Sequence, residues 1–472
     1  MPASFSPPSP SAPLPEHAPV ATTDDTRLAA SALARRLKAN RLSRRDTLWL
    51  FAAASGAAAL QGCSTSPVTG ERILVGLTES QERSVDAQQA PHQFSRDLGA
   101  VQIPAVNAYV TDVGKRLQTG VHRRDMPYSY RVLNANYVNA YTFPAGAMGV
   151  TRGIMVDMQT EAELAALLGH ELGHVNARHA AQRQGQAMAA QVAVVTLGAA
   201  TSDSRWSPLI SMGAQIGASA LLSSYSRDNE READALGQRY MVQAGYPATG
   251  MVQLHQLLVD GHTRQPSVLE TMFASHPMGT ERRDTARRLA ETAYAQSRGA
   301  PDGRERFMDS TAALRQLKPT IEACKQGETA LAARSLTEAQ RQFGEALRLS
   351  PRDYPALLRM GQTLQAQGRL AEARRHVDAA REAYPQEAQA VRLNASLKLG
   401  LRDPASALQD LESFERLLPG DPSIGFLKGV SLEGMGRRDA AAREFQRFLA
   451  ASPQGDAAGY SASRLKAWGY LK

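Results

Sequence analysis

The clearest periodic pattern in the chain lies near its middle, between Glu161 and Gln184. Apolar residues recur there every three or four positions, as they do along one face of an α-helix. They are Leu164, Leu167, Leu168, Leu172 and Val175. The pattern predicts one helix over 161–184 that buries this apolar face in a core.

Two shorter apolar stretches follow between Ala187 and Leu222, separated by the polar run 202–205. Each stretch is too short to cross a bilayer comfortably, and each contains a glutamine, Gln191 or Gln215. We expect amphipathic helices that pack on the surrounding domain. Contact with a membrane or cover over a cleft is the alternative.

A third pattern is a repeat near the C-terminus. Four prolines stand 34 residues apart, at Pro351, Pro385, Pro419 and Pro453. Small residues keep a second register with the same step, at Gly327, Gly361, Ala395 and Gly429. This pattern resembles tetratricopeptide repeats, in which a proline ends each unit and small residues lie where two helices pack closely. The pattern predicts an all-α solenoid over 319–472, ending in a capping helix over 454–472, whose concave face binds extended segments or partner helices.

Composition narrows the classes of protein. The chain has 472 residues, too many for one ordinary core, and its 43% hydrophobic and 21% charged residues are typical of folded domains. The net charge of +8 is spread along the chain, without a basic block that contains aromatic residues, which argues against nucleic acid as a partner. Two cysteines, Cys63 and Cys324, cannot form a disulfide framework, and we expect Cys324 to be a small core residue of a helix.

The first 62 residues have the pattern of a leader. Residues 1–40 are rich in Pro, Ser and Ala, and we expect them to be disordered or to precede the true start. Three arginines then precede the apolar run 48–60, which ends in Leu60-Gln61-Gly62-Cys63. A basic segment, a short apolar core and small residues before a cleavage point are typical of a secretory signal.

The sequence LQGC at the end of this leader resembles a bacterial lipobox, which implies cleavage before Cys63 and lipidation of its thiol. Ser64, rather than aspartate, follows the cysteine, and the sorting rule of such lipoproteins then implies the outer membrane. Residues 43–48 (SRRDTL) resemble a twin-arginine signal without its full consensus, so the export route stays open. A buried Ala-rich helix with a chance cysteine is the alternative.

Candidate chemistry lies on the helix predicted over 161–184. His170 and His174 are four residues apart on one helix face, so both imidazoles can bind one tetrahedral zinc ion. Glu171 can take a proton from a water molecule, whose pKa the zinc lowers, as this water attacks a peptide carbonyl. The sequence HELGH at 170–174 is therefore the HExxH signature of metallopeptidases, although the signature alone does not establish a site.

A catalytic zinc needs a third protein ligand, and the segment 226–234 (SRDNEREAD) offers one. Glu230 and Asp234 are four residues apart and share one face of a second predicted helix. Glu230 would be the third ligand, and Asp234 would accept a hydrogen bond from a ligand histidine and fix its orientation. Taken alone, this arginine-rich segment also fits an ordinary solvated helix face. The HELGH motif favours the ligand interpretation.

HELGH (170–174) together with SRDNEREAD (226–234) resembles the zinc peptidase family that includes the CAAX-prenyl protease, HtpX and Oma-type enzymes. The segment 139–153 (NAYTFPAGAMGVTRG) is also similar to that family. The lipobox, the PVTGERILVG segment after it and the repeats narrow the resemblance to the periplasmic branch of β-barrel assembly-enhancing proteases, over most of the chain from Val68 onward. The resemblance implies a gluzincin-type domain with one zinc ion per chain.

The resemblance implies two further features. In the family, the segment 139–153 forms an edge strand above the zinc, to which the substrate backbone adds as a further strand. The alternation in 147–151 is compatible with such a strand. His276, in the sequence ASHP and with Arg282 beyond it, resembles the SHPxxxxR element of the periplasmic branch. There the histidine approaches the zinc as an additional, regulatory ligand that holds the enzyme silent. An ordinary loop histidine before a proline is the alternative.

Three other residues receive less definite expectations. His179 lies five residues past His174 and so points away from the zinc face, and we expect it to be a surface residue or one that supports a ligand from behind. His255 has no partner at a usable spacing. Tyr225 is only a weak candidate for stabilising the oxyanion, because nothing but its position before the second helix supports it.

These patterns predict an α+β architecture: a mainly helical zincin catalytic domain followed by an all-α tetratricopeptide-repeat solenoid. The expected divisions are a leader over 1–62, a peptidase domain over 63–300, a linker over 301–318 and repeats over 319–472.

The predicted activity is zinc-dependent endopeptidase hydrolysis in the bacterial cell envelope, with His170, His174 and Glu230 as ligands and Glu171 as general base. By resemblance, the substrates are unfolded or misassembled envelope proteins, and the repeats contact the outer-membrane assembly machinery. A lipid anchor would hold the chain at the periplasmic face of the outer membrane; a soluble periplasmic protein is the alternative. Two other functions stay open: a repeat-based scaffold or chaperone with a silent zinc domain, and a peptidase that acts on itself or on one dedicated partner.

Overall fold

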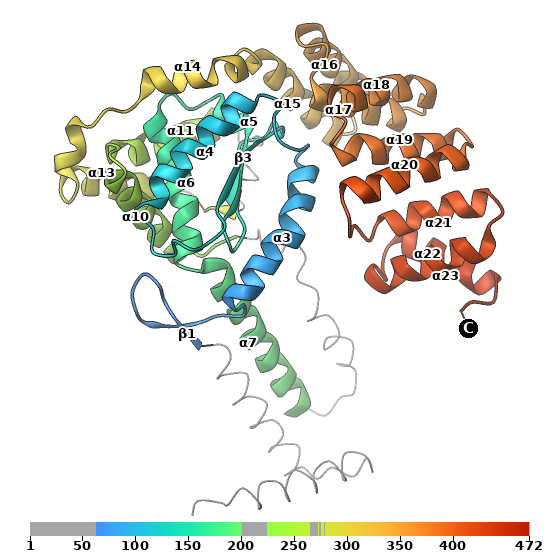
Figure 1. Ribbon diagram of the computed structural model, residues 1–472, viewed down its shortest axis with the longest axis horizontal. Coiled ribbons are helices and arrows are strands. Elements are labelled where there is room, and N and C mark those ends of the chain that lie inside the picture. The colour runs from blue at the N-terminus through green and yellow to red at the C-terminus, as the bar shows by residue number, and fades with distance from the viewer. Residues whose placement is uncertain (1–62, 201–223, 265–271, 273–274, 278, 472) are drawn as a thin grey trace, which may run out of the picture. The chain divides into compact units, whose positions relative to one another are not determined.

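The computed structural model describes residues 63–200, 224–264, 272, 275–277 and 279–471 (Figure 1). The leader expected over 1–62 therefore lies outside the described residues. Cys63, which follows it, is exposed and begins β1 (Cys63–Thr65). β1 and β2 (Arg72–Leu74) form a two-stranded sheet. Cleavage before Cys63 and lipidation of its thiol stay predictions.

A three-stranded sheet lies in the first domain, which runs from β2 to α14. Its strands are β3 (Ser129–Leu133), β4 (Ala140–Thr142) and β5 (Ala147–Thr151). β5 lies in the centre, parallel to β3 and antiparallel to β4. The expectation that 147–151 is the edge strand is therefore wrong. A turn that ends at Gly146, with a φ of 100°, folds the segment 139–153 back on itself, so its edge strand is β4.

Helices cover both faces of this sheet (Figure 1). Alternate side chains of a strand point to opposite faces, and apolar side chains lie on both faces here. Leu133, Tyr141 and Ala147 pack against α3 (Glu79–Arg96) on one face. Val132 and Val150 point into the main core on the other face. Helices that contribute to this core include α4 (Pro104–Gln118), α6 (Glu161–Asn176), α10 (Arg227–Gln243), α11 (Thr249–Arg264) and α13 (Thr280–Glu291).

The helix predicted over 161–184 is broken into two. α6 ends at Asn176, and α7 (His179–Ala200) begins after Arg178. Arg178 has a φ of 61°, in the left-handed region that ends a helix. The chain therefore changes direction between His174 and His179, and the two histidines do not belong to one continuous helix.

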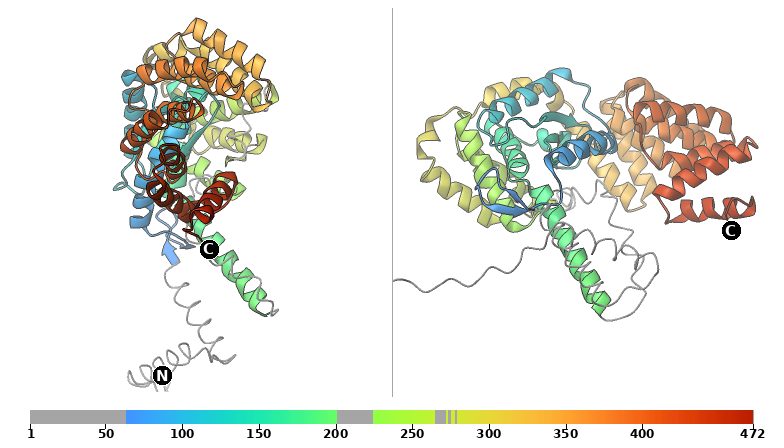
Figure 2. Two further views of the ribbon diagram at one scale, coloured as in Figure 1. Left: turned by 90° about the vertical axis from the view of Figure 1, so that its right-hand side faces the viewer. Right: turned by 60° about the horizontal axis from the view of Figure 1, so that its bottom comes forward.

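The Ala-rich stretch after this break is described as far as Ala200, and residues 201–222 of it lie outside the described residues. The start of α7 packs on the first domain, where Ala181 joins a small apolar cluster with Val75 and Leu77. The rest of α7 extends away from the domain in the views of Figures 1 and 2, which differs from the packed helix we expected. Within the described residues, no helix combines the length and the apolar character needed to cross a membrane.

The C-terminal third is an array of antiparallel helix pairs, which confirms the predicted solenoid (Figure 2). Its helices are α15 (Lys318–Ala332), α16 (Leu336–Leu349), α17 (Tyr354–Ala366), α18 (Leu370–Ala383), α19 (Ala388–Gly400), α20 (Pro404–Leu417), α21 (Ile424–Gly434), α22 (Arg438–Ala451) and α23 (Asp456–Ala467). The small-residue register has a steric cause: a Cβ at Gly327 would lie 2.6 Å from the ring of Phe343, and one at Gly429 would lie 2.4 Å from that of Phe445.

The stretch 301–318, expected as a linker, is largely helical. It contains α14 (Arg304–Arg315), which follows the short 3₁₀-helix η3 (Ala295–Gly299). Phe307 and Leu314 of α14 are buried in the core of the first domain. The chain thus passes to the repeats through packed structure rather than through an extended linker.

The repeats contact the first domain through buried polar groups. Arg152, at the start of α5 (Arg152–Met155), forms a two-pronged ion pair with Asp353, with Nη1 to Oδ2 at 2.6 Å and Nη2 to Oδ1 at 3.1 Å. Both side chains are almost fully buried. Farther along, the Ser95 hydroxyl at the end of α3 donates a hydrogen bond to the carboxylate of Glu387.

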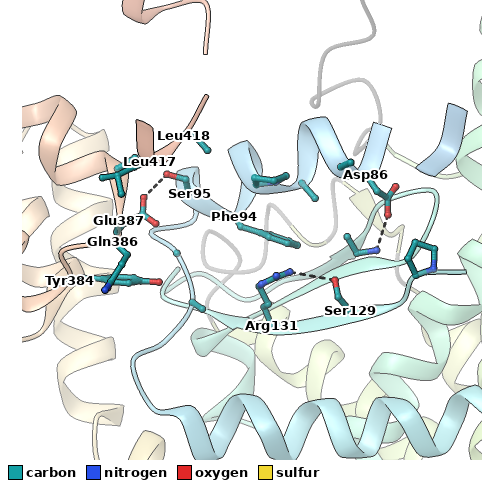
Figure 3. A pocket seen from close by; sticks show the side chains of 18 of the residues that line it. Asp86, Phe94, Ser95, Ser129, Arg131, Tyr384, Gln386, Glu387, Leu417 and Leu418 are labelled. Carbon is teal, nitrogen blue, oxygen red and sulfur yellow. Dashed lines mark hydrogen bonds between the residues drawn. The ribbon is translucent and has the colours of Figure 1, made fainter. Parts of the chain in front are cut away.

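A pocket of about 450 Å³ lies beside this second contact, between α3, β3 and the repeats (Figure 3). Phe94 and Arg131 line it from the first domain, with the Arg131 guanidinium 5.1 Å from the centre of the Phe94 ring. Tyr384, Glu387 and Leu417 line it from the repeats. Ser95 and Glu387 therefore line one side of this pocket. Glu387 is nevertheless only 5% exposed.

Glu387 is expected to make stability depend on pH. Burial raises its pKa from 4.5 to about 7 in the folded protein. Between these two values the unfolded chain has released the proton and the folded chain keeps it, so stability falls as pH rises. Glu387→Gln removes this loss and should stabilise the protein by roughly 2–3 kcal/mol at pH values above 7. The free energies of unfolding of wild type and Glu387→Gln are measured in urea, once below pH 4.5 and once above pH 7.

At a pH below 4.5 both side chains are neutral, so we expect wild type and Glu387→Gln to have the same stability there. Glu382→Gln, at an exposed position nearby, is the matched control and should change neither measurement. An equal gain from Glu387→Gln at low and at high pH would contradict a titrating carboxyl at this contact.

Candidate metal centre

The centre is built where α6 and α10 approach closely. All residues of α6 are buried, so its histidines face neighbouring helices instead of solvent. A Cβ at Gly173 would lie 2.7 Å from the carbonyl oxygen of Ala233, and one at Gly237 would lie 2.7 Å from the backbone nitrogen of His170. Because glycine has no side chain at these two positions, α10 can approach close enough to place Glu230 opposite the histidines.

Four side chains meet at this contact: His170, His174, Glu230 and His276, with one potential ligand atom of each within 4.8 Å of the others. The Nε2 atoms of His170 and His174 lie 3.0 Å apart. The carboxylate of Glu230 lies 3.5 Å from Nε2 of His170 and 3.4 Å from Nε2 of His174. All four side chains are buried. Imidazole nitrogens and a carboxylate oxygen that converge in this way fit a metal ion.

His276 is the fourth member. Its Nδ1 lies 3.3 Å from Nε2 of His170 and 3.1 Å from Oε1 of Glu230. Its backbone N–H donates to the carbonyl of Met272, at 2.7 Å. The structure therefore places this histidine among the candidate ligands. A role in silencing an enzyme stays a proposal.

Glu171 lies beside the group. Both of its carboxylate oxygens are buried, and neither has a hydrogen-bond partner among the described residues. Its Oε1 is 3.7 Å from Nε2 of His276. Burial raises the pKa of Glu171 above its usual range. A carboxylate held in this state readily accepts a proton from a reactant that enters the site.

Asp234 lies one turn beyond Glu230 on α10 and contacts the back of His170, with Oδ1 2.9 Å from Nδ1. Arg282 on α13 donates to both oxygens of Asp234, at 2.6 and 2.7 Å, and its Nη1 lies 2.6 Å from Oε2 of Glu230. His255 on α11 adds a contact of 3.3 Å to Asp234. Three helices therefore hold the two carboxylates in place.

These contacts set the charge of the carboxylates. Burial alone would raise the pKa of Glu230, but the nearby His276, His174 and His170 outweigh it and hold the pKa well below its usual range. Burial would also raise the pKa of Asp234, and there His255 and Arg282 hold it well below its usual range. Both side chains are therefore ionised at neutral pH, as a metal ligand and a hydrogen-bond acceptor must be.

Three further residues lie around these groups. His179, expected at the surface or behind the ligands, is buried behind His174: its Nδ1 is 2.9 Å from Nδ1 of His174, because the break at Arg178 turns the chain back. His255 reaches Asp234 from a separate helix, so no spacing in the sequence could have indicated it. The ring of Tyr225 stacks on that of His174, with 3.9 Å between ring centres.

Comparisons with known proteins agree with this arrangement. Residues 104–290 match the sequence model of Peptidase family M48, and residues 330–397 match that of the tetratricopeptide repeat. The chain is 29% identical to metalloprotease YcaL of Escherichia coli over 256 residues, which cover 50% of this chain and 95% of YcaL.

A second relative is the beta-barrel assembly-enhancing protease of Yersinia pestis, which is 27% identical over 227 residues that cover 46% of each chain. The chain thus spans less than half the length of the beta-barrel assembly-enhancing proteases that it matches. Among solved structures, the crystal structure of MamA protein aligns with a TM-score of 0.29 and 16% identity, over 32% of this chain and 84% of that one.

The match to the peptidase family covers α4 to α13, the part of the chain that holds HELGH, Glu230 and His276. The second match falls on the helix pairs that follow. Residues 104–290 are therefore similar to the metallopeptidases of Peptidase family M48, and tetratricopeptide repeats follow them.

Proposed function

We propose that this chain is a zinc-dependent endopeptidase of the bacterial cell envelope that cleaves misfolded or stalled proteins. The observation that supports it most strongly is the buried group of His170, His174 and Glu230, with the carboxylate of Glu171 beside it. That carboxylate has no hydrogen-bond partner among the described residues. A buried carboxylate without a partner is costly, and a role in a reaction explains why it is kept.

His170, His174 and Glu230 would hold zinc through two nitrogens and one oxygen, a donor set typical of catalytic zinc sites. Three protein ligands leave a fourth position for water or substrate. When bound, zinc supplies Lewis-acid chemistry, lowering the pKa of a water molecule and polarising a peptide carbonyl. The contacts of His170 with Asp234 and of His174 with His179 keep the Nε2 atoms of both ligands turned toward this position.

Glu171 would act as the general base. It follows His170 directly on α6, and its carboxylate lies within the same buried space as the four candidate ligands. It would take a proton from the attacking water and then pass it to the amide nitrogen of the departing product.

β4 would be the edge to which the substrate adds, and its three residues are buried in this structure. Asn139 and Phe143, which flank this strand, hydrogen-bond with Thr151 and Ala147 of β5. Because the direction of hydrogen bonds alternates along an antiparallel strand, the backbone groups of Ala140 and Thr142 point away from β5. Within the described ranges, no further strand pairs with that side. A substrate backbone that adds there would be recognised mainly through its main chain, which suits a peptidase for misfolded proteins.

The proposed location rests on the leader and on the relatives. The lipobox ending at Cys63 supports a lipid anchor at the periplasmic face of the outer membrane. The relatives named beta-barrel assembly-enhancing protease support a role near outer-membrane assembly, and the repeats support recognition of protein partners.

Removal of the metal tests the proposal. Protein purified with zinc should degrade casein, lose this activity after dialysis against a chelator, and regain it when zinc is added back. Elemental analysis should give one zinc ion per chain before dialysis. Casein is an unfolded bystander, so its degradation also separates a general peptidase from one that acts only on itself or on one partner. Casein cleavage by metal-free protein would contradict a zinc enzyme.

His276→Ala is expected to increase casein cleavage. In the structure His276 lies against both His170 and Glu230, where it would compete with water and substrate for the fourth zinc position. Removing a competitor worth about 1.4 kcal/mol raises the rate tenfold, so we expect an increase of about that size. His376→Ala, in the repeats, is the control. An unchanged or lower rate, with zinc still bound, would rule out self-inhibition through His276.

A further inference from the structure

A row of polar contacts runs from His174 to the surface of the first domain. Nδ1 of His174 lies 2.9 Å from Nδ1 of His179, and Nε2 of His179 lies 3.1 Å from Oε2 of Glu232. His179 is fully buried, whereas the side chain of Glu232 is 35% exposed. The row therefore connects a candidate metal ligand with a half-exposed carboxylate.

The positions of the hydrogens in this row follow from the role of His174, so the inference rests on the proposed function. Nε2 of His174 faces His170 and Glu230, where the zinc would bind. A neutral imidazole that binds metal through Nε2 carries its hydrogen on Nδ1. His174 must then donate from Nδ1, and Nδ1 of His179 must accept. The single hydrogen of His179 is consequently on Nε2, where it is donated to Glu232.

The two histidine ligands are thus supported in different ways. Nδ1 of His170 meets the carboxylate of Asp234 directly. Nδ1 of His174 meets a carboxylate only through the ring of His179. Glu232 and Asp234 both belong to α10, two and four residues after Glu230. One helix therefore provides a candidate ligand and the carboxylates behind both histidines.

The position of His179 depends on the break between α6 and α7. Arg178 adopts its left-handed conformation while its side chain is held by three groups. Its Nε donates to Glu82 at 3.1 Å, Nη1 to the Ser64 hydroxyl at 2.8 Å, and Nη2 to the carbonyl of Leu77 at 2.8 Å. A strained residue kept in place by several contacts beside a reactive centre is typical of a functional constraint.

We propose that His179 is a positioning residue which, with Glu232 behind it, fixes the ring orientation of His174 and the hydrogen on its Nδ1, so that Nε2 is free to bind zinc. Hydrogen bonds behind metal ligands orient them and strengthen metal binding. His179 touches neither substrate nor metal in this arrangement and acts only through His174.

Zinc affinity tests the proposal without relying on activity. Zinc is titrated into the purified metal-free protein in competition with a chromogenic chelator. His179→Leu removes the acceptor and should weaken zinc binding about 10–100-fold. In His179→Asn the side-chain oxygen can take the place of Nδ1, so this variant should retain more of the affinity. Glu232→Gln keeps an acceptor for Nε2 of His179 and should lose the least. The absorption spectrum of the cobalt-substituted protein should change in His179→Leu, because a reoriented His174 alters the ligand geometry.

Two controls separate the possible failures. Asp228→Asn, at an exposed position on α10, should bind zinc as wild type does. If wild type and His174→Ala bind zinc equally, the proposed function itself fails. If His174→Ala abolishes binding while His179→Leu binds as wild type does, only the positioning role fails. Equal losses in His179→Leu and His179→Asn would also overturn it, because packing would then be the only contribution of the residue.

Discussion

Glu171→Gln is expected to lower the rate of casein cleavage by about 10²–10⁴-fold, while zinc stays bound. Glutamine has the size and shape of glutamate but cannot take a proton from the attacking water. The side chains of His170, His174 and Glu230 are unchanged in this variant. Because neither oxygen of Glu171 has a hydrogen-bond partner among the described residues, the substitution breaks no hydrogen bond of the fold. Cleavage rate and zinc content are measured on the same preparation.

Asp228→Asn is the matched control, since it makes the same acid-to-amide change at an exposed position of the same domain. It should cleave casein at the rate of wild type. Wild-type activity in Glu171→Gln would show that another group is the base. Loss of both activity and zinc would instead assign Glu171 to metal binding and leave the base unknown.

Asp353→Asn is expected to lower the free energy of unfolding by about 3–5 kcal/mol. Asp353 is the only counter-charge of the Arg152 guanidinium among the ion pairs of the described residues. Without it, a buried positive charge is left uncompensated. Asparagine can still accept the hydrogen bond from the backbone N–H of Ala356 that begins α17. The loss therefore measures the charge pair rather than the helix cap. Unfolding in urea gives the difference.

A second variant shows whether the cost comes from the unpaired charge. Replacing both Arg152 and Asp353 by apolar residues of similar volume should restore a large part of the stability lost in Asp353→Asn. Glu338→Gln, which removes an exposed ion pair with Arg341 in α16, should leave unfolding unchanged. A change in Asp353→Asn no larger than that in Glu338→Gln would mean that the contact between Arg152 and Asp353 does not hold the repeats on the first domain.

The sequence was sufficient for the parts of the fold that repeat at a fixed period. The 34-residue spacing predicted the helix pairs, and the close contacts of Gly327 with Phe343 and of Gly429 with Phe445 explain the small residues in that pattern. The spacing of HELGH and of Glu230 and Asp234 also predicted which side chains share a helix face. The structure adds that the two faces meet.

Features that depend on contacts between distant segments were not predictable. The left-handed conformation of Arg178 is held by Glu82, Ser64 and Leu77, which lie far away in the sequence, so the apolar pattern suggested one helix where there are two. The order of β4 and β5 depends on a turn that the alternation in 147–151 does not reveal. His255 and Arg282 reach Asp234 from two further helices.

The close approach of α6 and α10 has a consequence for which sequences can support this chemistry. The candidate nitrogen ligands His170 and His174 lie on α6, and the candidate carboxylate ligand Glu230 lies on α10. Metal affinity therefore depends on the distance between these two helices. Gly173 sets that separation, because even a methyl group would push against the backbone at Ala233. The glycine of HELGH has no functional group to offer, yet it decides whether the histidines on either side of the motif can reach their partner. A substitution of Gly173 would leave every candidate ligand in the sequence but move them too far apart to bind one metal ion.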